Sequence, residues 1–422
     1  MIDVNLIRKD AEAVRQRYLT RGKDIDFAPF LQLDEQRKQL IATVEAMKAQ
    51  RNKVSAEVPK LKKQGLDVSQ TISEMKALGE KISQQDALLA QVNAQIRDFL
   101  LRLPNLPDED LVAGGKENNQ VVKYFGEKPQ FDFQPKDHTE LCKSLGLIDY
   151  ERGVKLAGNG SWIYTGVGAQ LEWALLNYFI ECHLKDGYTF MLPPYMLGYD
   201  CGLTAGQFPK FEDDVYQIAN GEGNKFMLPT AETALVNYYR DEILSENQLP
   251  KKIFAYSACF RKGAGSYRSE ERGMIRGHQF NKVELFQYTT KDGSDQAFEE
   301  LVNKACALVE GLGLHYRLSK LAAGDCSDSM ARTYDIEIYI PSMGIYKEVS
   351  SASNARDYQA RRGNMRYRTK DGKIEFVHTL NASGLATSRV FPALLEQFQN
   401  ADGSVNIPEP LQKYMGGLKV IK

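Results

Sequence analysis

The sequence lacks several features that would mark it as a specialised class of protein. Its six cysteines are widely separated and none forms a CxxC pair, which argues against a zinc knuckle or a disulfide framework. No apolar run approaches the roughly 20 residues that a membrane span needs, and the N-terminal segment MIDVNLIRKD has no apolar core. The formal net charge is only −1, so no global basic field points to nucleic acid. These absences predict a reduced, cytosolic protein in which any contact with RNA comes from local patches.

The chain is long enough for more than one domain. Its 422 residues predict two or three domains with ample core. The character of the sequence changes at residues 103–119, LPNLPDEDLVAGGKENN, which are rich in Pro, Gly and Asn and are typical of a linker. We therefore expect an α+β protein with one domain over residues 1–110 and a second over residues 118–422, the second containing an antiparallel sheet flanked by helices.

Apolar residues in the N-terminal part recur every seven positions. The first run comprises Leu33, Leu40, Met47, Val54 and Leu61, and the second comprises Met75, Ile82, Leu89, Ile96 and Leu103. Pro59 and Gly65 interrupt the pattern between the runs and predict a turn. Two heptad runs joined by a short turn predict an antiparallel coiled-coil arm, each helix about 30 residues and about 45 Å long.

The expected arm carries basic residues along its sides and at its tip. They are Lys48, Arg51, Lys53, Lys60, Lys62 and Lys63, and they are interspersed with glutamates. Mixed charge of this kind is typical of a solvated helix face. A projecting arm does not contribute to the core of a domain, however, so we also interpret it as an element that binds a large partner.

A charged segment in the second domain, residues 259–286, combines a predicted strand, a long loop and a returning strand. It begins at Phe260-Arg261, passes through a loop rich in Gly, Arg and Glu, and ends in the alternation Phe280, Lys282, Glu284, Phe286. Loops this long within a domain are often functional, and arginines suit phosphate because guanidinium offers fixed paired donors. An ordinary solvated hairpin is the alternative.

Three further segments carry candidate functional residues. Thr230-Ala231-Glu232 follows Pro229 where a helix is expected to begin, so its local role would be a helix cap. Alternation predicts strands around residues 334–340 and 346–350, joined by the turn PSMG. In HTLNASGLATSR a strand is expected to end at Asn381, with a small-residue turn opening a helix that carries Arg389.

These motifs resemble those of the seryl-tRNA synthetases, a family of class II aminoacyl-tRNA synthetases. Phe260-Arg261, the GSY of the loop, and HQF at residues 278–280 resemble motif 2. A predicted helix over residues 170–183, followed by a strand ending at Pro193-Pro194, resembles motif 1, and residues 378–398 resemble motif 3. The resemblance implies a homodimeric serine–tRNA ligase whose N-terminal arm grips the long variable arm of tRNA(Ser), and whose catalytic domain occupies residues 118–422.

The resemblance also implies roles for individual residues. ATP would be bound by Arg261, Lys262, Gly263, Phe280, Glu348, Val349, Ser350, Ser351 and Arg389, with Arg261, Arg389 and Glu348 catalytic. Serine would be bound by Thr230, Ala231, Glu232, Arg261, Glu284 and Ser383. Mg²⁺ would be held by Glu348 and Ser351, which offer the oxygen ligands that this ion prefers. The arginines that follow this segment could form a structural charge network or contact the acceptor stem of the tRNA, and both interpretations remain open. They are Arg361, Arg362, Arg366 and Arg368.

The chain departs from the family pattern at a few positions. Gly263 stands where the family usually has a glutamate that reads the adenine amino group, and Ala382 and Ser388 stand where glycine is usual. Two other functions therefore remain open: a paralogue that activates an amino acid for a carrier or a biosynthetic pathway, and an RNA-binding relative with weak or no catalysis. The arm argues against the first, because charging a carrier needs no grip on tRNA. Retention of Arg261 and Arg389 argues against the second.

Overall fold

The computed structural model describes residues 1–219, 223–263 and 273–422, which fold into two compact units. One unit comprises Met1–Asp3, Arg17–Lys23 and Pro104–Lys422, and the other comprises Val4–Gln16 and Asp24–Leu103. The GSY sequence and the Arg and Glu side chains expected in the 264–272 loop fall outside the described residues. Across the described ranges, no helix is both long enough and apolar enough to cross a membrane.

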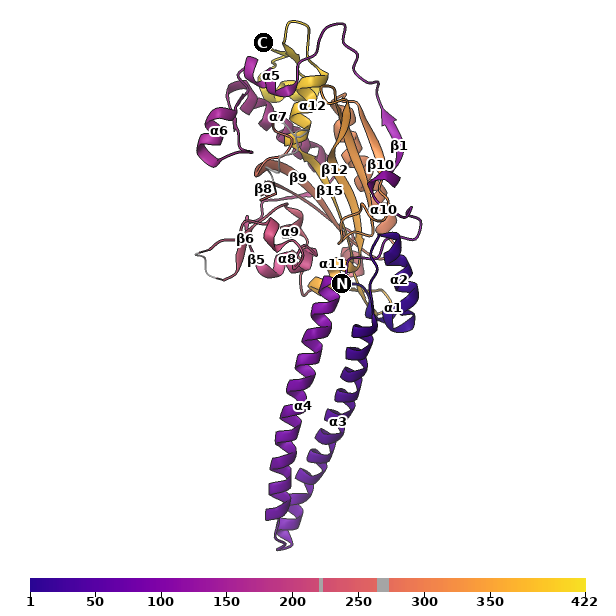
Figure 1. Ribbon diagram of the computed structural model, residues 1–422. Helices are drawn as coiled ribbons and strands as arrows, with labels where there is room; N and C mark the ends of the chain where they lie inside the picture. The colour runs from indigo at the N-terminus through magenta and orange to yellow at the C-terminus, as the bar shows by residue number, and fades with distance from the viewer. Residues whose placement is uncertain (220–222, 264–272) are drawn as a thin grey trace. The chain divides into compact units, whose positions relative to one another are not determined.

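The smaller unit is built on an antiparallel pair of long helices, α3 (Ala28–Lys63) and α4 (Ser69–Arg102), as Figure 1 shows. We call this pair the arm. Apolar side chains from both helices are buried along their length: Phe30, Leu40, Val44, Ile82, Val92 and Leu100. Near the start of α3 and the end of α4, the rings of Phe30 and Phe99 stack with centroids 5.8 Å apart. The expected helical arm is confirmed. The short helices α1 (Val4–Lys9) and α2 (Ala11–Thr20) precede it.

The expected break at Pro59 is wrong, because α3 continues through this residue to Lys63. Proline removes one helical N–H, so the carbonyl four residues earlier loses its partner. That carbonyl belongs to Ser55, and both residues are exposed, so water can satisfy it. The helix ends instead near Gly65, whose φ of +74° suits glycine and reverses the chain.

The larger unit contains an eight-stranded sheet in the order β1-β10-β11-β12-β15-β9-β8-β4. Its strands are β1 (Gln120–Phe125), β4 (Thr189–Met191), β8 (Lys251–Phe260), β9 (Gln279–Thr289), β10 (Tyr316–Lys320), β11 (Arg332–Ile340), β12 (Ile345–Arg356) and β15 (His378–Ala386). Neighbours are antiparallel except for β4 and β8, which run parallel. Short pairs and a three-stranded sheet use β2 (Ile148–Asp149), β3 (Ile163–Tyr164), β5 (Met196–Gly198), β6 (Lys225–Met227), β7 (Ile243–Ser245), β13 (Arg366–Arg368), β14 (Ile374–Phe376), β16 (Val405–Asn406) and β17 (Val420–Ile421).

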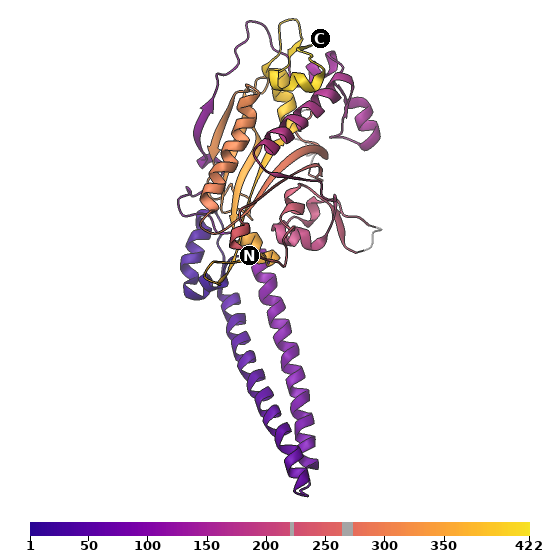
Figure 2. The same cartoon turned by 180° about the vertical axis from the view of Figure 1, so that it is seen from behind.

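Three helices cover one face of this sheet, α7 (Gly166–Lys185), α10 (Ser294–Gly311) and α12 (Thr387–Gln397), and Figure 2 shows α7 and α10 on that side. The remaining helices of the unit are α5 (His138–Ser144), α6 (Tyr150–Ala157), α8 (Tyr199–Ala205), α9 (Glu232–Leu235), α11 (Tyr358–Gly363) and α13 (Glu409–Gln412). Alternation along β9 sends Val283 and Leu285 into the core under the helices and leaves Lys282 and Glu284 for the opposite face. The α+β fold with a largely antiparallel sheet is confirmed.

The expected end of a strand at Asn381 is wrong, because β15 runs on to Ala386 before α12 begins. The predicted turn Ala382-Ser383-Gly384 is part of the strand. The reason is that β15 continues to pair with β9 as far as Ala386, although its pairing with β12 ends at Ala382. Small residues suit this position, since a Cβ on Gly384 would lie 2.5 Å from His183 Nε2.

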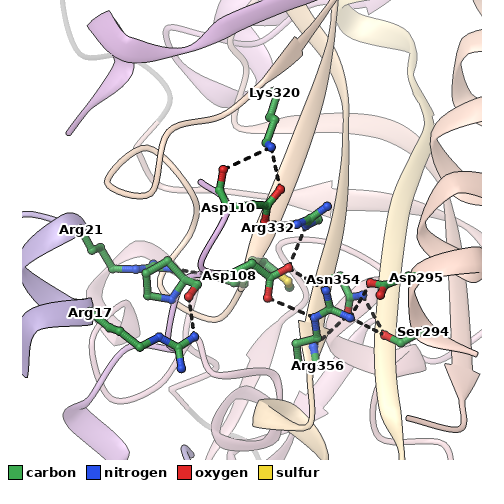
Figure 3. Close-up of polar contacts among 12 residues, drawn as sticks. Arg17, Arg21, Asp108, Asp110, Ser294, Asp295, Lys320, Arg332, Asn354 and Arg356 are labelled. Atoms are coloured by element: carbon green, nitrogen blue, oxygen red, sulfur yellow. Dashed lines mark hydrogen bonds and ion pairs between the residues drawn. The ribbon is translucent and has the colours of Figure 1, made fainter. Parts of the chain in front are cut away.

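The segment that follows the arm is fastened to the sheet by ion pairs (Figure 3). Asp108 accepts hydrogen bonds at 2.7 Å from both Arg332 Nε on β11 and Arg356 Nη2 on β12. Asp110 pairs with Lys320 of β10 at 2.7 Å. A segment that composition marks as a linker is therefore ordered here.

The chain also leaves and re-enters the larger unit at neighbouring points. Tyr18 Oη donates a hydrogen bond of 2.6 Å to the carbonyl of Pro104, and Arg17 Nη2 donates one of 2.6 Å to the carbonyl of Pro107. Residues just before and just after the 24–103 excursion are thus joined directly.

Candidate active site

A cavity of about 590 Å³ lies in the larger unit, lined by residues of three sheet strands, β9, β12 and β15, and of segments that include those near residues 206–232 and 327–330. Its lining includes many of the predicted site residues: Thr230, Glu232, Arg261, Gly263, Phe280, Glu348, Val349, Ser351, Ser383 and Arg389. These residues lie up to 159 positions apart in the chain, from Thr230 to Arg389, yet they line one cavity. Its polar and aromatic lining suits a small charged ligand.

At one side of the cavity an arginine lies over an aromatic ring. The guanidinium carbon of Arg261, which follows β8, is 5.2 Å from the centroid of Phe280 on β9. Arg261 Nε also donates to the carbonyl of Pro229 at 3.2 Å. Gly263 lines the same region, and among the described residues a Cβ placed on it would meet only Arg276 Nη2, at 3.8 Å. No described atom therefore crowds a side chain at this position.

Thr230 lies one residue before Ala231, the N-cap of α9, and also belongs to the cavity lining. Its hydroxyl oxygen accepts a hydrogen bond of 3.3 Å from the backbone N–H of Glu232 at the start of α9. The same oxygen accepts from Lys282 Nζ at 2.7 Å and donates to Glu284 Oε2 at 3.1 Å. The local and the functional interpretation of this segment are thus compatible.

Glu232 is held by amides from distant parts of the chain. Gln359 Nε2 of α11 donates to one carboxylate oxygen at 2.9 Å, and Asn381 Nδ2 of β15 donates to the other at 3.3 Å. Burial, followed by the nearby charge of Glu284, raises the pKa of Glu232 to about 7. Gln359 and Asn381 were not among the predicted site residues. Alternation could have found Asn381, because it shares a strand face with Ser383, whereas nothing local points to Gln359.

Three oxygen-bearing side chains meet on β11 and β12. Ser351 Oγ lies 2.7 Å from Asp335 Oδ1 and 2.8 Å from Glu348 Oε1. A hydroxyl has one proton and can donate to only one of two acceptors at a time. Burial and the charge of Glu348 raise the pKa of Asp335 well above its usual value, while Arg389 and Ser351 lower the pKa of Glu348 against the effect of burial.

This all-oxygen set fits a hard divalent cation such as Mg²⁺. It contains two carboxylates, and nowhere in the described part of the chain do three or more His, Cys, Asp or Glu side chains form a metal-binding group. A cation here would therefore need further oxygens from a ligand such as a polyphosphate. Glu348 and Ser351 were predicted as metal ligands and Asp335 was not, although pairing the two alternating strands places Asp335 beside Ser351.

Arg389 reaches the cavity from the first turn of α12. Its Nη1 donates to the carbonyl of Glu348 at 2.6 Å and lies 3.5 Å from Glu348 Oε2. Arg389 and Arg261 thus place two guanidinium groups at one cavity, in an arrangement suited to a polyanion.

Several predicted site residues do not line the cavity. Ala231, Glu284 and Ser350 are fully buried, and Lys262 is exposed. Ser350 Oγ donates to the carbonyl of Ser383 at 2.6 Å, so it joins two strands of the site from behind.

Two of the residues that depart from the family pattern lie in different environments. Ala382 is in the apolar core and Ser388 lines the cavity. Among the four downstream arginines, Arg362 is buried and donates a hydrogen bond of 2.6 Å to the carbonyl of Phe208, so it stabilises the fold.

The predicted RNA-binding residues all lie on the arm. Lys53, Lys60, Lys62 and Lys63 are exposed, and the last three end α3. Lys48 Nζ pairs with Asp86 of α4 at 3.0 Å, and Arg51 is half-buried.

Comparison with known families divides the chain in the same order as the motifs. Residues 1–107 match the model of the seryl-tRNA synthetase N-terminal domain. Residues 213–398 match the model of the class II tRNA synthetase core domain (G, H, P, S and T).

Individual relatives are similar over nearly the whole chain. Serine–tRNA ligase 2 of Clostridium acetobutylicum is 60% identical over 421 residues, 99% of each chain, and serine–tRNA ligase of Caldicellulosiruptor bescii is 46% identical over 99% of each. Among solved structures, seryl-tRNA synthetase from Pyrococcus horikoshii complexed with ATP aligns with a TM-score of 0.92 at 31% identity, over 100% of this chain and 99% of that one. Cytoplasmic serine–tRNA ligase from Naegleria fowleri in complex with AMP aligns with a TM-score of 0.86 at 26% identity and the same coverage. Together with the motifs and the cavity, these similarities show that the chain belongs to the seryl-tRNA synthetase family of class II aminoacyl-tRNA synthetases.

Proposed function

We propose that the chain is a serine–tRNA ligase that uses ATP to activate serine and then transfers the seryl group to the 3′ end of tRNA(Ser). The observation that carries the proposal is the cavity itself: in a chain of this family, it unites two arginines suited to phosphates with a small, polar, partly acidic pocket. In the first step a carboxylate oxygen of serine forms a bond to the α-phosphorus, and the bond to the bridging oxygen breaks as pyrophosphate leaves. In the second, a ribose hydroxyl of the tRNA bonds to the carbonyl carbon, AMP departs and the hydroxyl proton is released.

Phosphorus substitution depends on positioning and charge neutralisation more than on a protein base. Arg261 is assigned to the α-phosphate and Arg389 to the γ-phosphate, with the adenine stacked on Phe280. ATP binding is also assigned to two neighbouring pairs of residues. Gly263 and Val349 line the cavity, and Lys262 and Ser350 are next to them in the chain. Glu348 and Ser351, joined by Asp335, would hold Mg²⁺, which when bound neutralises phosphate charge.

Serine binding is assigned to Thr230, Glu232, Arg261 and Ser383, which line the cavity, and to the buried Ala231 and Glu284, of which Glu284 accepts a hydrogen bond from Thr230. Glu232 takes the substrate ammonium, since it is the carboxylate of this set that lines the cavity. The hydroxyl of serine is recognised by buried polar groups that alanine would leave unpaired, and this is the physical basis for rejecting alanine.

The proposal extends to partners and assembly. The exposed basic residues of the arm contact the backbone of the long variable arm of tRNA(Ser), through charge and shape. The segment that resembles motif 1 exposes apolar side chains, with Leu192 72% and Trp173 52% exposed, and a second copy of the chain would cover them in a homodimer. The cytoplasmic relative from Naegleria fowleri supports a cytoplasmic location.

The test is ATP–pyrophosphate exchange with each of the standard amino acids, followed by charging of tRNA(Ser). Exchange that depends on serine, together with charging, supports the ligase. Serine-dependent exchange with no charging of tRNA(Ser) would instead favour the carrier-charging paralogue. Absence of exchange with every amino acid, alongside retained tRNA binding, would favour the non-catalytic RNA-binding relative.

A further inference from the structure

The helix-covered side of the sheet carries a buried carboxyl group that the assigned site does not use. Glu172 lies on α7 with 3% of its surface exposed, and it is not part of the cavity lining. Burying a carboxyl group costs free energy unless it is hydrogen-bonded, and here burial raises the pKa of Glu172 to about 7. The hydrogen bonds that Glu172 accepts therefore indicate what this residue does.

One oxygen of Glu172 joins two segments that are distant in the chain. Its Oε1 accepts a hydrogen bond of 2.8 Å from Asn281 Nδ2 on β9 and another from the hydroxyl of Thr387, the first residue of α12. The Thr387 hydroxyl also lies 3.2 Å from the carbonyl oxygen of Asn281. Groups from α7, β9 and α12 thus meet around a single carboxyl oxygen.

Asn281 and Thr387 are each flanked by residues that line the cavity. These neighbours are Phe280, Lys282, Ala386 and Ser388. Asn281 and Thr387 do not belong to the lining, because their side chains point toward Glu172 on α7. Glu172 is therefore hydrogen-bonded directly behind two separate parts of the cavity wall.

A second buried residue of α7 supports the same region. His183 lies eleven residues after Glu172, which is about three helical turns and places both on one face of α7. Its Nε2 is 3.0 Å from the carbonyl oxygen of Gly384 on β15. Burial lowers the pKa of His183 to about 4, so the ring is neutral at physiological pH and Nε2–H can donate to this carbonyl. Through these contacts α7 holds both ends of residues 384–387, immediately before Arg389.

We propose that Glu172 is a positioning residue for serine activation, which fixes the strand that carries Phe280 relative to the helical turn that carries Arg389. The proposal rests on the serine–tRNA ligase function and adds to it a group that does not touch the substrates. Attack on the α-phosphorus requires the adenine end and the phosphate end of ATP to be held in one geometry, so it depends on the relation between these two parts of the wall. Both hydrogen bonds need only an acceptor oxygen, so this role does not require a charge on Glu172.

The test separates the acceptor oxygen of Glu172 from its charge and its volume. Glu172→Met removes the acceptor and should lower the kcat of serine-dependent pyrophosphate exchange about 10- to 100-fold, the effect of displacing part of the site by about 1 Å. The KM values for ATP and serine should stay within about threefold of wild type, because the residues that bind each substrate are all present. Glu172→Gln keeps a carbonyl oxygen in the same place and should retain kcat within about threefold.

Hydrogen exchange gives a second readout, which requires no activity. The backbone amides of residues 384–389 should exchange faster in Glu172→Met than in wild type, because their support from α7 is lost. In Glu172→Gln they should exchange at the wild-type rate. If Glu172→Met folds poorly, Thr387→Val removes the donor at similar volume and should lower kcat without raising either KM.

The matched control removes a buried hydrogen bond elsewhere on α7. Tyr178 Oη donates to the carbonyl of Leu308 at 3.1 Å, and neither residue lines the cavity. Tyr178→Phe should lower the unfolding temperature but leave kcat and the exchange of residues 384–389 unchanged.

Three results would each overturn the proposal: wild-type kcat in Glu172→Met, a loss of kcat in Glu172→Gln as large as in Glu172→Met, or an equal loss in Tyr178→Phe. A wild-type protein without serine-dependent exchange would overturn the ligase function instead. Hydrogen exchange of residues 384–389 would in that case still test the positioning by Glu172.

Discussion

The arm and the sheet unit use charged side chains in different ways. On the arm, charges lie on the surface of two helices, and pairs such as Lys48 with Asp86 form beside an apolar seam that repeats every seven residues. In the sheet unit, charges such as Lys282 and Glu284 are buried and satisfied by groups from distant segments. Interactions on the arm are therefore local and replaceable one at a time, whereas those of the cavity depend on one another. Five experiments test this contrast.

Removing the whole arm should separate the two halves of the reaction. Replacing residues 24–103 with a short Gly/Ser linker should lower charging of tRNA(Ser) by at least about a thousandfold, because most phosphate contacts are lost. Serine-dependent pyrophosphate exchange should stay within about threefold of wild type. Charging that survives at ordinary tRNA concentrations would show that the arm is not the RNA grip.

Single changes at the phosphate arginines should have the next largest effect. Arg389→Ala and Arg261→Ala should each slow pyrophosphate exchange about 100- to 1,000-fold, the loss typical of a preorganised donor in a closed site. Arg368→Ala, an exposed arginine on β13, is the control and should behave as wild type. Wild-type exchange in either cavity variant would remove that arginine from the phosphate site.

Gly263 tests a departure from the family pattern within the cavity. Because no described atom lies closer than 3.8 Å to a Cβ at this position, Gly263→Glu should restore a contact to the adenine amino group and lower the KM for ATP by about 10- to 150-fold. Discrimination against purine nucleotides that lack the 6-amino group should sharpen in parallel. Gly263→Ala separates the carboxylate from the added Cβ. Equal KM values in wild type and Gly263→Glu would mean that this position does not read the base.

Glu232 should make serine binding depend on pH. Its pKa of about 7, raised by burial and by Glu284, leaves the carboxyl largely protonated at lower pH. The substrate ammonium favours the carboxylate, so the KM for serine should fall as pH rises from 6 to 8, by about tenfold, with the KM for ATP nearly constant. Glu232→Gln should bind serine weakly and without this trend. A flat wild-type profile would contradict the assignment.

One lysine on the arm should matter least. Lys62→Met removes an exposed charge near the tip and should reduce the slope of log affinity for tRNA(Ser) against log salt by up to about one, with no change in serine activation. Lys48→Met should have a smaller effect on this slope, because that lysine is paired with Asp86. An unchanged slope in the Lys62 variant would place the tip outside the RNA contact.

Local features of the structure could be predicted from the sequence, and features that depend on distant segments could not. The arm was predictable because each turn of its seam repeats a local pattern, and the one error, at Pro59, arose where solvent tolerates a missing hydrogen bond. Motif 2 and its strands were also predictable from alternation and resemblance. Gln359, one of the two partners of Glu232, was not predictable, since it comes from a helix 127 positions away and joins the site only through tertiary packing. The end of β15 was missed because pairing with β9 continues to Ala386 and outweighs the small, turn-like residues of this segment.

The joining of Tyr18 to Pro104 has a consequence for how such a protein can diverge. Both ends of residues 24–103 adjoin segments that are fixed within the larger unit. The packing of that unit therefore does not determine how many residues lie between these ends. The entropy of closing a longer excursion grows only logarithmically, and one added heptad in each helix lengthens the pair by about 10 Å. Lineages can therefore match the reach of the arm to RNAs of different size by gaining or losing paired heptads, while the sheet and its cavity are inherited unchanged.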